Sequence, residues 1–339
     1  NDRTWCFWEK PNGDYENLVN KKWNTAVFVN YNYSRDLDLN PYQYKMIQGL
    51  GFYNYIFEII SKEENIEFSN QKVLDFKEEN NQVFIRTETE NFTCKKLFNS
   101  IFDPREILKQ DNYPLLQQHF IGWKIKTSEP VFTPEKATFM DFSVAQKGNT
   151  RFMYVLPFSE TEALLEYTLF SKDLLSEKEY EDEIKNYIEK LGIKNYEILE
   201  KERGNIPMTS YNFWNQNSKN IVNIGSAGGW TKASTGYTFK NASKKSKTLV
   251  SFLLEENDFR KFHKKDKFWF YDVLLLDILA KKNHVGSSIF SSMFKKGNPS
   301  LIFKFLDEET SLFEDIQVIL KCPKALFLNA LANRLIKFK

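Results

Sequence analysis

Four strand-like segments follow one another in the middle of the chain, and no helical pattern separates them. The segments are Phe120–Lys126, Thr138–Ala145, Arg151–Pro157 and Ala163–Phe170. Each is rich in β-branched, aromatic or other apolar residues, which is typical of strands. Strands that run consecutively without intervening helices favour an antiparallel sheet. An amphipathic helix over Ser176–Leu191 and a further strand over Tyr196–Arg203 are predicted next.

A second constraint is a glycine-rich segment that follows an apolar run. Ile221–Ile224 leads into Gly225–Gly236, which holds four glycines in twelve residues, and a helical pattern comes after it. A strand, a glycine turn and a helix start can direct backbone N–H groups at an anion or a flat cofactor ring. Glycine is also the usual residue where φ is positive, so a tight structural crossover explains the pattern equally well.

The rest of the chain divides into a strand-rich first part and a helical last part. Strands are predicted over Ala26–Val29, Val83–Thr89 and Lys96–Phe102, and a helix over Tyr42–Ser61. After the glycine-rich segment the predicted helices are Thr248–Glu256, Phe268–Lys281, Leu301–Leu306, Leu312–Leu320 and Ala325–Ile336. Together these elements predict an α/β protein with a mixed sheet and a helical C-terminal part.

Composition and charge exclude several classes of function. The 339 residues carry a net charge of +2, so no overall field favours nucleic acid. The three cysteines and three histidines are scattered, which gives no metal-ligand spacing and fits a reducing cytosol. No uncharged apolar run approaches the ~20 residues that span a bilayer. The 31 phenylalanines reflect either a biased genome or a large apolar pocket.

One basic and aromatic stretch, Phe259–Phe270, interleaves Lys and Arg with Phe and Trp. Three interpretations stay open for it. They are a nucleic-acid groove, an interfacial membrane patch and a solvated loop before a helix.

Two carboxylates stand inside apolar strands and are candidates for chemistry. Glu166 lies in Leu164–Thr168, and Asp141 lies between Met140 and Phe142. A carboxylate in such a run faces either solvent or a cavity, because a buried charge needs a partner. In an apolar cavity, desolvation would raise the pKa of Glu166 and suit it to general acid catalysis near neutral pH.

Seven segments, taken in order, resemble the lycopene β-cyclases of the flavobacterial type over essentially the whole chain. They are NDRTWCFWE at 1–9, QQHFIGWKIKT at 117–127, ATFMDF at 137–142, RFMYVLPFSETEALLEYTLFS at 151–171, GNIPMT at 204–209, IGSAGGWTKASTGYTF at 224–239 and FKFLDEET at 303–310. Each motif is short, and the common order gives the resemblance its weight.

The resemblance implies a glutathione-reductase-like flavoprotein fold and an FAD-dependent isomerase (intramolecular lyase) of carotenoid biosynthesis. The enzyme would close the ψ-ends of lycopene into β-rings, giving γ-carotene and then β-carotene. It would use reduced FAD without net redox change, with NADPH as reductant. The implied location is the cytoplasm with peripheral attachment to the membrane, where the carotenoid substrate is found. The resemblance leaves the oligomeric state open.

Site residues follow from matching the family's motifs to this chain. The catalytic acid maps to Glu166, and the second acidic position of that motif is Tyr167 here, so the motif itself offers one carboxylate. Substrate-binding residues are predicted to be Trp123, Asp141, Tyr154 and Tyr167. The predicted FAD contacts are Arg3, Thr4, Trp5, Gly225, Ser226, Ala227, Gly228, Gly229, Ser234, Thr235 and Gly236.

The family pattern also predicts how the chain is organised. Residues 1–110 are expected to be the remainder of an FAD-binding domain, 111–203 an antiparallel substrate-binding sheet, 204–258 a return to the FAD domain, and 259–339 a helical region. The family's opening βαβ unit with its Gly-x-Gly-x-x-Gly turn has no counterpart here, so we expect it to be missing. Two alternatives remain: a redox flavoenzyme acting on an isoprenoid, and an inactive fragment that lacks the FAD phosphate site.

Overall fold

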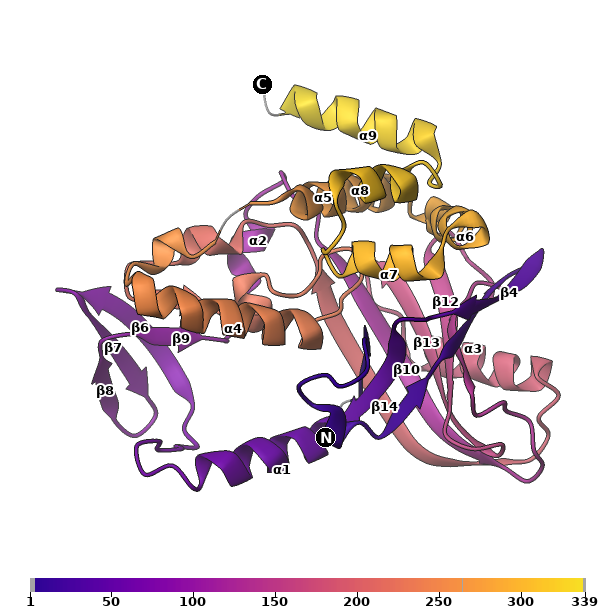
Figure 1. Ribbon diagram of the computed structural model, residues 1–339, viewed down its shortest axis with the longest axis horizontal. Coiled ribbons are helices and arrows are strands. Elements are labelled where there is room, and N and C mark those ends of the chain that lie inside the picture. Colours follow the sequence, from indigo (N-terminus) through magenta and orange to yellow (C-terminus); the bar gives the residue numbers. More distant parts are fainter. Residues whose placement is uncertain (1–3, 264, 338–339) are drawn as a thin grey trace. The chain divides into compact units, whose positions relative to one another are not determined.

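The computed structural model describes residues 4–263 and 265–337, which fall into two units (Figure 1). Unit 1 contains the described parts of Asn1–Phe52, Leu115–Pro207 and Leu274–Lys339. Unit 2 contains Tyr53–Pro114 and Met208–Val273, with its uncertain residue left aside. The four-part division predicted from the sequence stays a prediction.

The main sheet of unit 1 has seven strands in the order β14-β10-β13-β12-β11-β3-β4. Their bounds are β3 Thr25–Asn30, β4 Tyr33–Asp38, β10 Leu116–Thr127, β11 Lys136–Asp141, β12 Thr150–Pro157, β13 Glu162–Ser171 and β14 Tyr196–Met208. Neighbours among β10 to β13 pair antiparallel, and β11 pairs parallel with β3. The antiparallel sheet predicted for the middle of the chain is therefore confirmed.

Helix α3 (Glu177–Lys190) covers one face of this sheet, against β10 and β13 (Figure 1). A capping box formed by Ser176 and Glu179 begins the helix. Its buried face packs on strand residues such as Trp123 and Leu165, in one apolar cluster. Each large apolar side chain buried in this way contributes roughly 1.5–3 kcal/mol.

Aromatic side chains and helices α6 (Gly286–Lys296) and α7 (Pro299–Leu306) pack against the other face. Phe290 of α6 contacts Phe142 and Phe170, with ring centroids 6.0 Å apart in both pairs. Phe303 of α7 lies 5.5 Å from Phe139. Many of the chain's phenylalanines thus join the sheet to its helices.

A smaller antiparallel sheet of unit 1 has the order β1-β5-β2, with bounds β1 Thr4–Glu9, β5 Gln43–Gln48 and β2 Lys21–Trp23. The helix predicted over Tyr42–Ser61 is wrong in its first part, because β5 precedes α1 (Gly49–Ile60). Strand β5 is buried on both faces, and a short apolar run of this kind cannot be told from a helix by periodicity. Its Lys45 is fully buried and bonds Glu9 and Glu16.

Unit 2 combines a three-stranded meander with a parallel strand pair and a helix. The meander is β6 (Val73–Glu79), β7 (Gln82–Thr87) and β8 (Asn91–Cys94), and β9 (Leu97–Asn99) pairs parallel with β15 (Ile221–Asn223). Helix α2 (Arg105–Leu108) follows β9, and α4 (Phe239–Glu255) follows the glycine-rich segment. The predicted strand, glycine turn and helix are all present.

The C-terminal part is helical, as predicted. Its other helices are α5 (Lys267–Lys281), α8 (Leu312–Ile319) and α9 (Lys324–Lys337). Helix α6 was not predicted, because four serines and two glycines interrupt the apolar pattern between 286 and 297. Within the described residues, none of the helices has the length and apolar character needed to cross a membrane.

Candidate active site

Glu166 lies on the face of the main sheet opposite to α3. It stands in the middle of β13, directly opposite Gly122 of β10 on one side and Tyr154 of β12 on the other. Side chains alternate along a strand, so Leu164, Glu166 and Thr168 share this face. The sequence left open whether Glu166 faces solvent or a cavity. In the structure its side chain lies on the face of the sheet that carries the rings of Phe139, Phe152 and Tyr154.

A second carboxyl group, that of Glu202, meets Glu166 across β10. Glu202 comes from β14, and the two carboxyl groups are hydrogen bonded to each other. Strands two places apart in a sheet are separated by about 10 Å, so two glutamate side chains can reach each other only above the strand between them. The residue between them is Gly122, which has no side chain to occupy that space.

The space above Gly122 is filled by Glu202 itself. A Cβ atom at position 122 would lie 3.1 Å from Cγ of Glu202, 3.1 Å from Cδ1 of Leu164 and 3.4 Å from Oε1 of Glu202. Such contacts are tight, so any larger residue would displace Glu202. Glycine at this position therefore allows the two carboxyl groups to meet.

Further donors hold both carboxyl groups in place. The Thr168 hydroxyl donates to Oε1 of Glu166 at 2.6 Å. The side chain and the backbone N–H of Thr4, on β1, donate to Glu202. The Cys6 thiol, two residues further along β1, is hydrogen bonded to Tyr44, and burial together with the two carboxylates raises its pKa well above 9.0.

Burial raises the pKa of both glutamates above the ordinary value of 4.5. The charge of Glu202 raises the pKa of Glu166 further, and the hydrogen bond from Glu166 stabilises the ionised form of Glu202. Because two adjacent carboxylates cannot both ionise without strong repulsion, the pair holds one proton near neutral pH. Glu166 and Glu202 both keep partial solvent exposure, so the pair is not sealed in the core.

Aromatic rings line the sheet next to Glu166. Tyr154, directly across from Glu166, makes edge contacts with Phe139 at 6.0 Å and Phe152 at 5.2 Å between ring centroids. All three rings are buried. The electron-rich faces of such rings attract positive charge. The arrangement therefore combines a carboxyl group of raised pKa with aromatic rings that favour a nearby cation.

Three of the four predicted substrate residues lie on the α3 face instead. Trp123 and Tyr167 belong to the apolar cluster under α3. Asp141, at the end of β11, accepts a hydrogen bond of 2.7 Å from the Tyr187 hydroxyl of α3, and Ser143 also donates to it. The structure thus brings Tyr154 to Glu166 but not these three residues. Their contact with substrate stays a prediction without support from their placement.

The predicted cofactor residues near the start of the chain also lie on different faces of their strand. Thr4 contacts Glu202, whereas Trp5 points to the other face of β1 and packs edge-on against Phe52 at 5.5 Å. Arg3 lies outside the described residues. A role of these residues in binding FAD stays a prediction.

In unit 2 the glycine-rich segment forms a tight crossover between β15 and α4. Gly225, Gly229 and Gly236 have φ values of 56°, 67° and 75°, which side chains other than glycine rarely adopt. A Cβ atom at Gly228 would lie 2.1 Å from the carbonyl oxygen of Asn223, so close packing of the backbone requires glycine at this position. At Gly225 a Cβ would meet nothing within 4 Å, so its backbone borders open space.

Polar side chains of the crossover differ in their contacts. Ser226 and Thr231 are hydrogen bonded at 3.1 Å, and Lys232 forms a buried ion pair with Asp272 at 3.0 Å. The buried Oγ of Ser234 has no hydrogen-bond partner within the described residues. A buried hydroxyl without a partner is costly, and a ligand atom would satisfy it. Thr235, also predicted to contact the cofactor, lies in the same turn.

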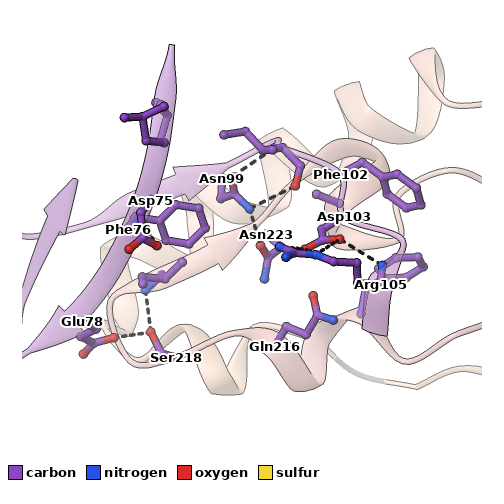
Figure 2. A pocket seen from close by; sticks show the side chains of 16 residues that line it. Asp75, Phe76, Glu78, Asn99, Phe102, Asp103, Arg105, Gln216, Ser218 and Asn223 are labelled. Carbon is purple, nitrogen blue, oxygen red and sulfur yellow. Dashed lines mark hydrogen bonds and ion pairs between the residues drawn. The ribbon is translucent and has the colours of Figure 1, made fainter. Parts of the chain in front are cut away.

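A cavity of about 550 Å³ in unit 2 has the crossover residue Ala227 in its lining (Figure 2). Asn99 of β9 and Asn223 of β15 meet there through a hydrogen bond of 2.8 Å. Asp103 is paired with Arg105, and Glu78 binds Ser218, so these charges are already engaged (Figure 2). Glu166 does not line this cavity.

The basic and aromatic stretch Phe259–Phe270 does not present all its rings to solvent. Phe259 and Phe268 are buried, and Phe262 packs against the same apolar cluster as Phe259. Lys265 lies over the Trp269 ring, 4.8 Å from its centroid. Packing within unit 2 accounts for these aromatic residues, and the three interpretations of the stretch stay predictions.

Comparison with solved structures defines the class of fold. A flavoprotein/dehydrogenase from Cytophaga hutchinsonii superposes with a TM-score of 0.56 and 15% identity, over 92% of this chain and 83% of that chain. A geranylgeranyl bacteriochlorophyll reductase-like protein from Thermoplasma acidophilum gives 0.53 and 13%, over 93% and 81%. The fold is the mixed α/β fold of FAD-dependent flavoproteins, as the resemblance predicted.

Sequence comparison defines the family within that class. The family model of the lycopene cyclase protein matches residues 1–332, and the chain belongs to this family. A lycopene beta-cyclase from Paracoccus sp. is 30% identical over 136 residues, which are 37% of this chain and 33% of the relative. The matched part thus spans a third of that curated relative.

Glu166 was predicted from the sequence as a site residue, and Glu202 was not. Glu202 lies two residues before the motif at 204–209. The residues that precede it on β14 are mostly exposed, and several of them are charged. No local spacing links it to Glu166. The sequence holds one related signal: a glycine at position 122, inside an otherwise apolar strand, indicates the close approach of another group but does not identify that group.

Proposed function

We propose that the protein is a lycopene β-cyclase, an isomerase that closes the ψ-ends of lycopene into β-rings. The observation that carries the proposal is the Glu166–Glu202 pair, in which burial and the neighbouring carboxylate raise the pKa of Glu166 to about 8, directly across the strands from Tyr154. Membership of the lycopene cyclase family supports the carotenoid substrate.

In the proposed reaction Glu166 protonates the terminal double bond of the ψ-end. The resulting tertiary cation is attacked by a neighbouring double bond, which closes the ring, and loss of a proton forms the ring double bond. Tyr154, Phe139 and Phe152 favour the cation and exclude water that would trap it. Protons and electrons balance, so the product is an isomer of the substrate.

FAD is the proposed cofactor, because the solved neighbours are flavoproteins and the crossover fits a bound ligand. Gly225, with open space at its Cβ position, and the unpartnered Ser234 hydroxyl are the residues that we propose contact it. Bound reduced flavin would supply negative charge that stabilises the cation. NADPH as reductant and a peripheral position on the membrane belong to the same proposal.

The test is conversion of lycopene by the protein in lycopene-accumulating cells and, after purification, in D₂O. Appearance of β-rings with one deuterium per ring, and no stoichiometric consumption of NADPH, is the expected result. Persistence of lycopene with folded, flavin-loaded protein would reject the proposal. Consumption of one NADPH per product would favour the redox flavoenzyme instead.

A further inference from the structure

The Glu166–Glu202 pair contains a second functional group that the family motif around Glu166 does not include. We propose that Glu202 is the catalytic base that accepts the ring proton and then returns it to Glu166. The inference rests on the proposed function and deepens it. It starts from the placement of Glu202 on β14, across Gly122, in hydrogen-bond contact with Glu166.

The geometry assigns opposite tasks to the two carboxyl groups. The two carboxyl groups are hydrogen bonded to each other, and the Thr168 hydroxyl gives Glu166 a single further donor. Thr4 also donates to Glu202, through its side chain and its backbone N–H. Hydrogen bonds to the ionised form favour a carboxylate, so the two donors of Thr4, against the single donor of Thr168, make Glu202 the better carboxylate of the pair.

The cycle balances without any further reactant. The O–H bond of Glu166 breaks and a C–H bond forms at the terminal alkene, whose electrons leave a tertiary cation. The ring closes, and the Glu202 carboxylate removes a proton from a ring carbon, whose C–H electrons become the ring double bond. Both reacting carbons are bonded to the same carbon in the closed ring, so two adjacent carboxyl groups can serve both. The proton then passes from Glu202 to Glu166 along their hydrogen bond.

Several other titratable groups face the pair. Cys6 of β1 faces both carboxyl groups, and its thiol is hydrogen bonded to Tyr44 of β5. On β14, the exposed Glu200 raises the pKa of Glu202 by its charge. Lys124 of β10 shares the face of Gly122, with its ammonium group over the Phe158 ring at 5.0 Å. Removal of the Glu202 charge therefore leaves Glu166 without an adjacent carboxylate.

The test compares Glu202→Gln and Glu202→Asp with the native protein, and Glu197→Gln serves as a control. Glu197 is exposed on the same strand, so its variant makes the same chemical change away from the pair. For Glu202→Gln we expect turnover to fall about 10²-fold or more at similar KM, because general bases contribute on this scale. The alkaline limb of the pH–rate profile should move to lower pH, since Glu166 loses a neighbouring charge that raised its pKa.

Two further readouts separate chemistry from packing. Without its base, the ring cation loses other neighbouring protons, so the fraction of ε- or γ-rings among the products should rise. Glu202→Asp, which keeps a carboxyl group, should recover part of the turnover. Infrared titration without substrate should show one protonated carboxyl near neutral pH in the native protein, titrating at lower pH in Glu202→Gln.

The outcomes distinguish this inference from the proposed function. Absence of cyclised product from flavin-loaded native protein rejects the proposed function. A native protein that cyclises lycopene while Glu202→Gln keeps native turnover, pH profile and product rings rejects the role of Glu202 alone.

Discussion

Gly122 is the position where the smallest perturbation should have the largest effect on catalysis. In Gly122→Ala, the added methyl group would lie 3.1 Å from Cγ of Glu202 and 3.1 Å from Cδ1 of Leu164. Ordinary contacts begin near 3.5 Å. Glu202, at the edge strand β14, must therefore move by a few tenths of an ångström, which strains its hydrogen bond to Glu166.

The expected cost differs between stability and activity. Replacing glycine by alanine within a strand stabilises by roughly 0.5–1 kcal/mol through the unfolded state, and the tight contacts offset about that amount. The free energy of unfolding should therefore change by less than about 1 kcal/mol. Small displacements of reacting groups reduce rates strongly, so we expect turnover to fall about 10-fold to 100-fold.

The assay measures lycopene turnover and urea unfolding on the same flavin-loaded preparations. Gly51→Ala is the control, because a Cβ atom at Gly51 in α1 would meet nothing within 4 Å. A Gly122→Ala protein with native turnover would refute the reasoning that Gly122 makes room for the pair. A loss of turnover that simply follows a loss of folded protein would refute it as well.

The remaining predictions concern stability. Asp141→Ala should lower the free energy of unfolding in urea by about 1–3 kcal/mol, because the buried Tyr187 hydroxyl loses its acceptor. Adding Tyr187→Phe should recover part of this loss of stability. Strictly additive losses from the two substitutions would contradict the pairing. Glu166→Gln should become more stable relative to the native protein as pH rises. The raised pKa means that the folded state binds the proton more tightly, so the native protein loses stability as pH rises from below 4.5 through that raised pKa. A stability difference that does not vary with pH would contradict a desolvated Glu166.

The sequence predicted those parts of the fold in which local pattern and tertiary environment agree. The strands around Glu166 and helix α3 have clear periodicity and clear boundaries, and the structure contains them. Strand β5 was taken for helix because both of its faces are buried, so its apolar residues do not alternate. Trp123 and Tyr167 were predicted to bind substrate because they are aromatic residues of the family motifs near Glu166 in the pattern, but residues next to Gly122 and Glu166 in a strand point to the opposite face.

Glu202 could not be predicted because its position beside Glu166 depends on the order of strands in the sheet. Strands β14 and β13 are both neighbours of β10, and only this order places Glu202 and Glu166 on either side of Gly122. The family motif offered a single carboxylate with Tyr167 in the second acidic position. The structure provides the second carboxyl group from a different strand.

The proposed cyclisation depends most on Glu166 as the acid that delivers a proton to the substrate. Its most direct test is the turnover of lycopene by Glu166→Gln at native flavin occupancy, because glutamine keeps the shape of the side chain and cannot donate an acidic proton. We predict that turnover falls by at least about 10²–10⁴-fold while the protein stays folded and yellow. Cyclisation at the native rate by this variant would contradict the account.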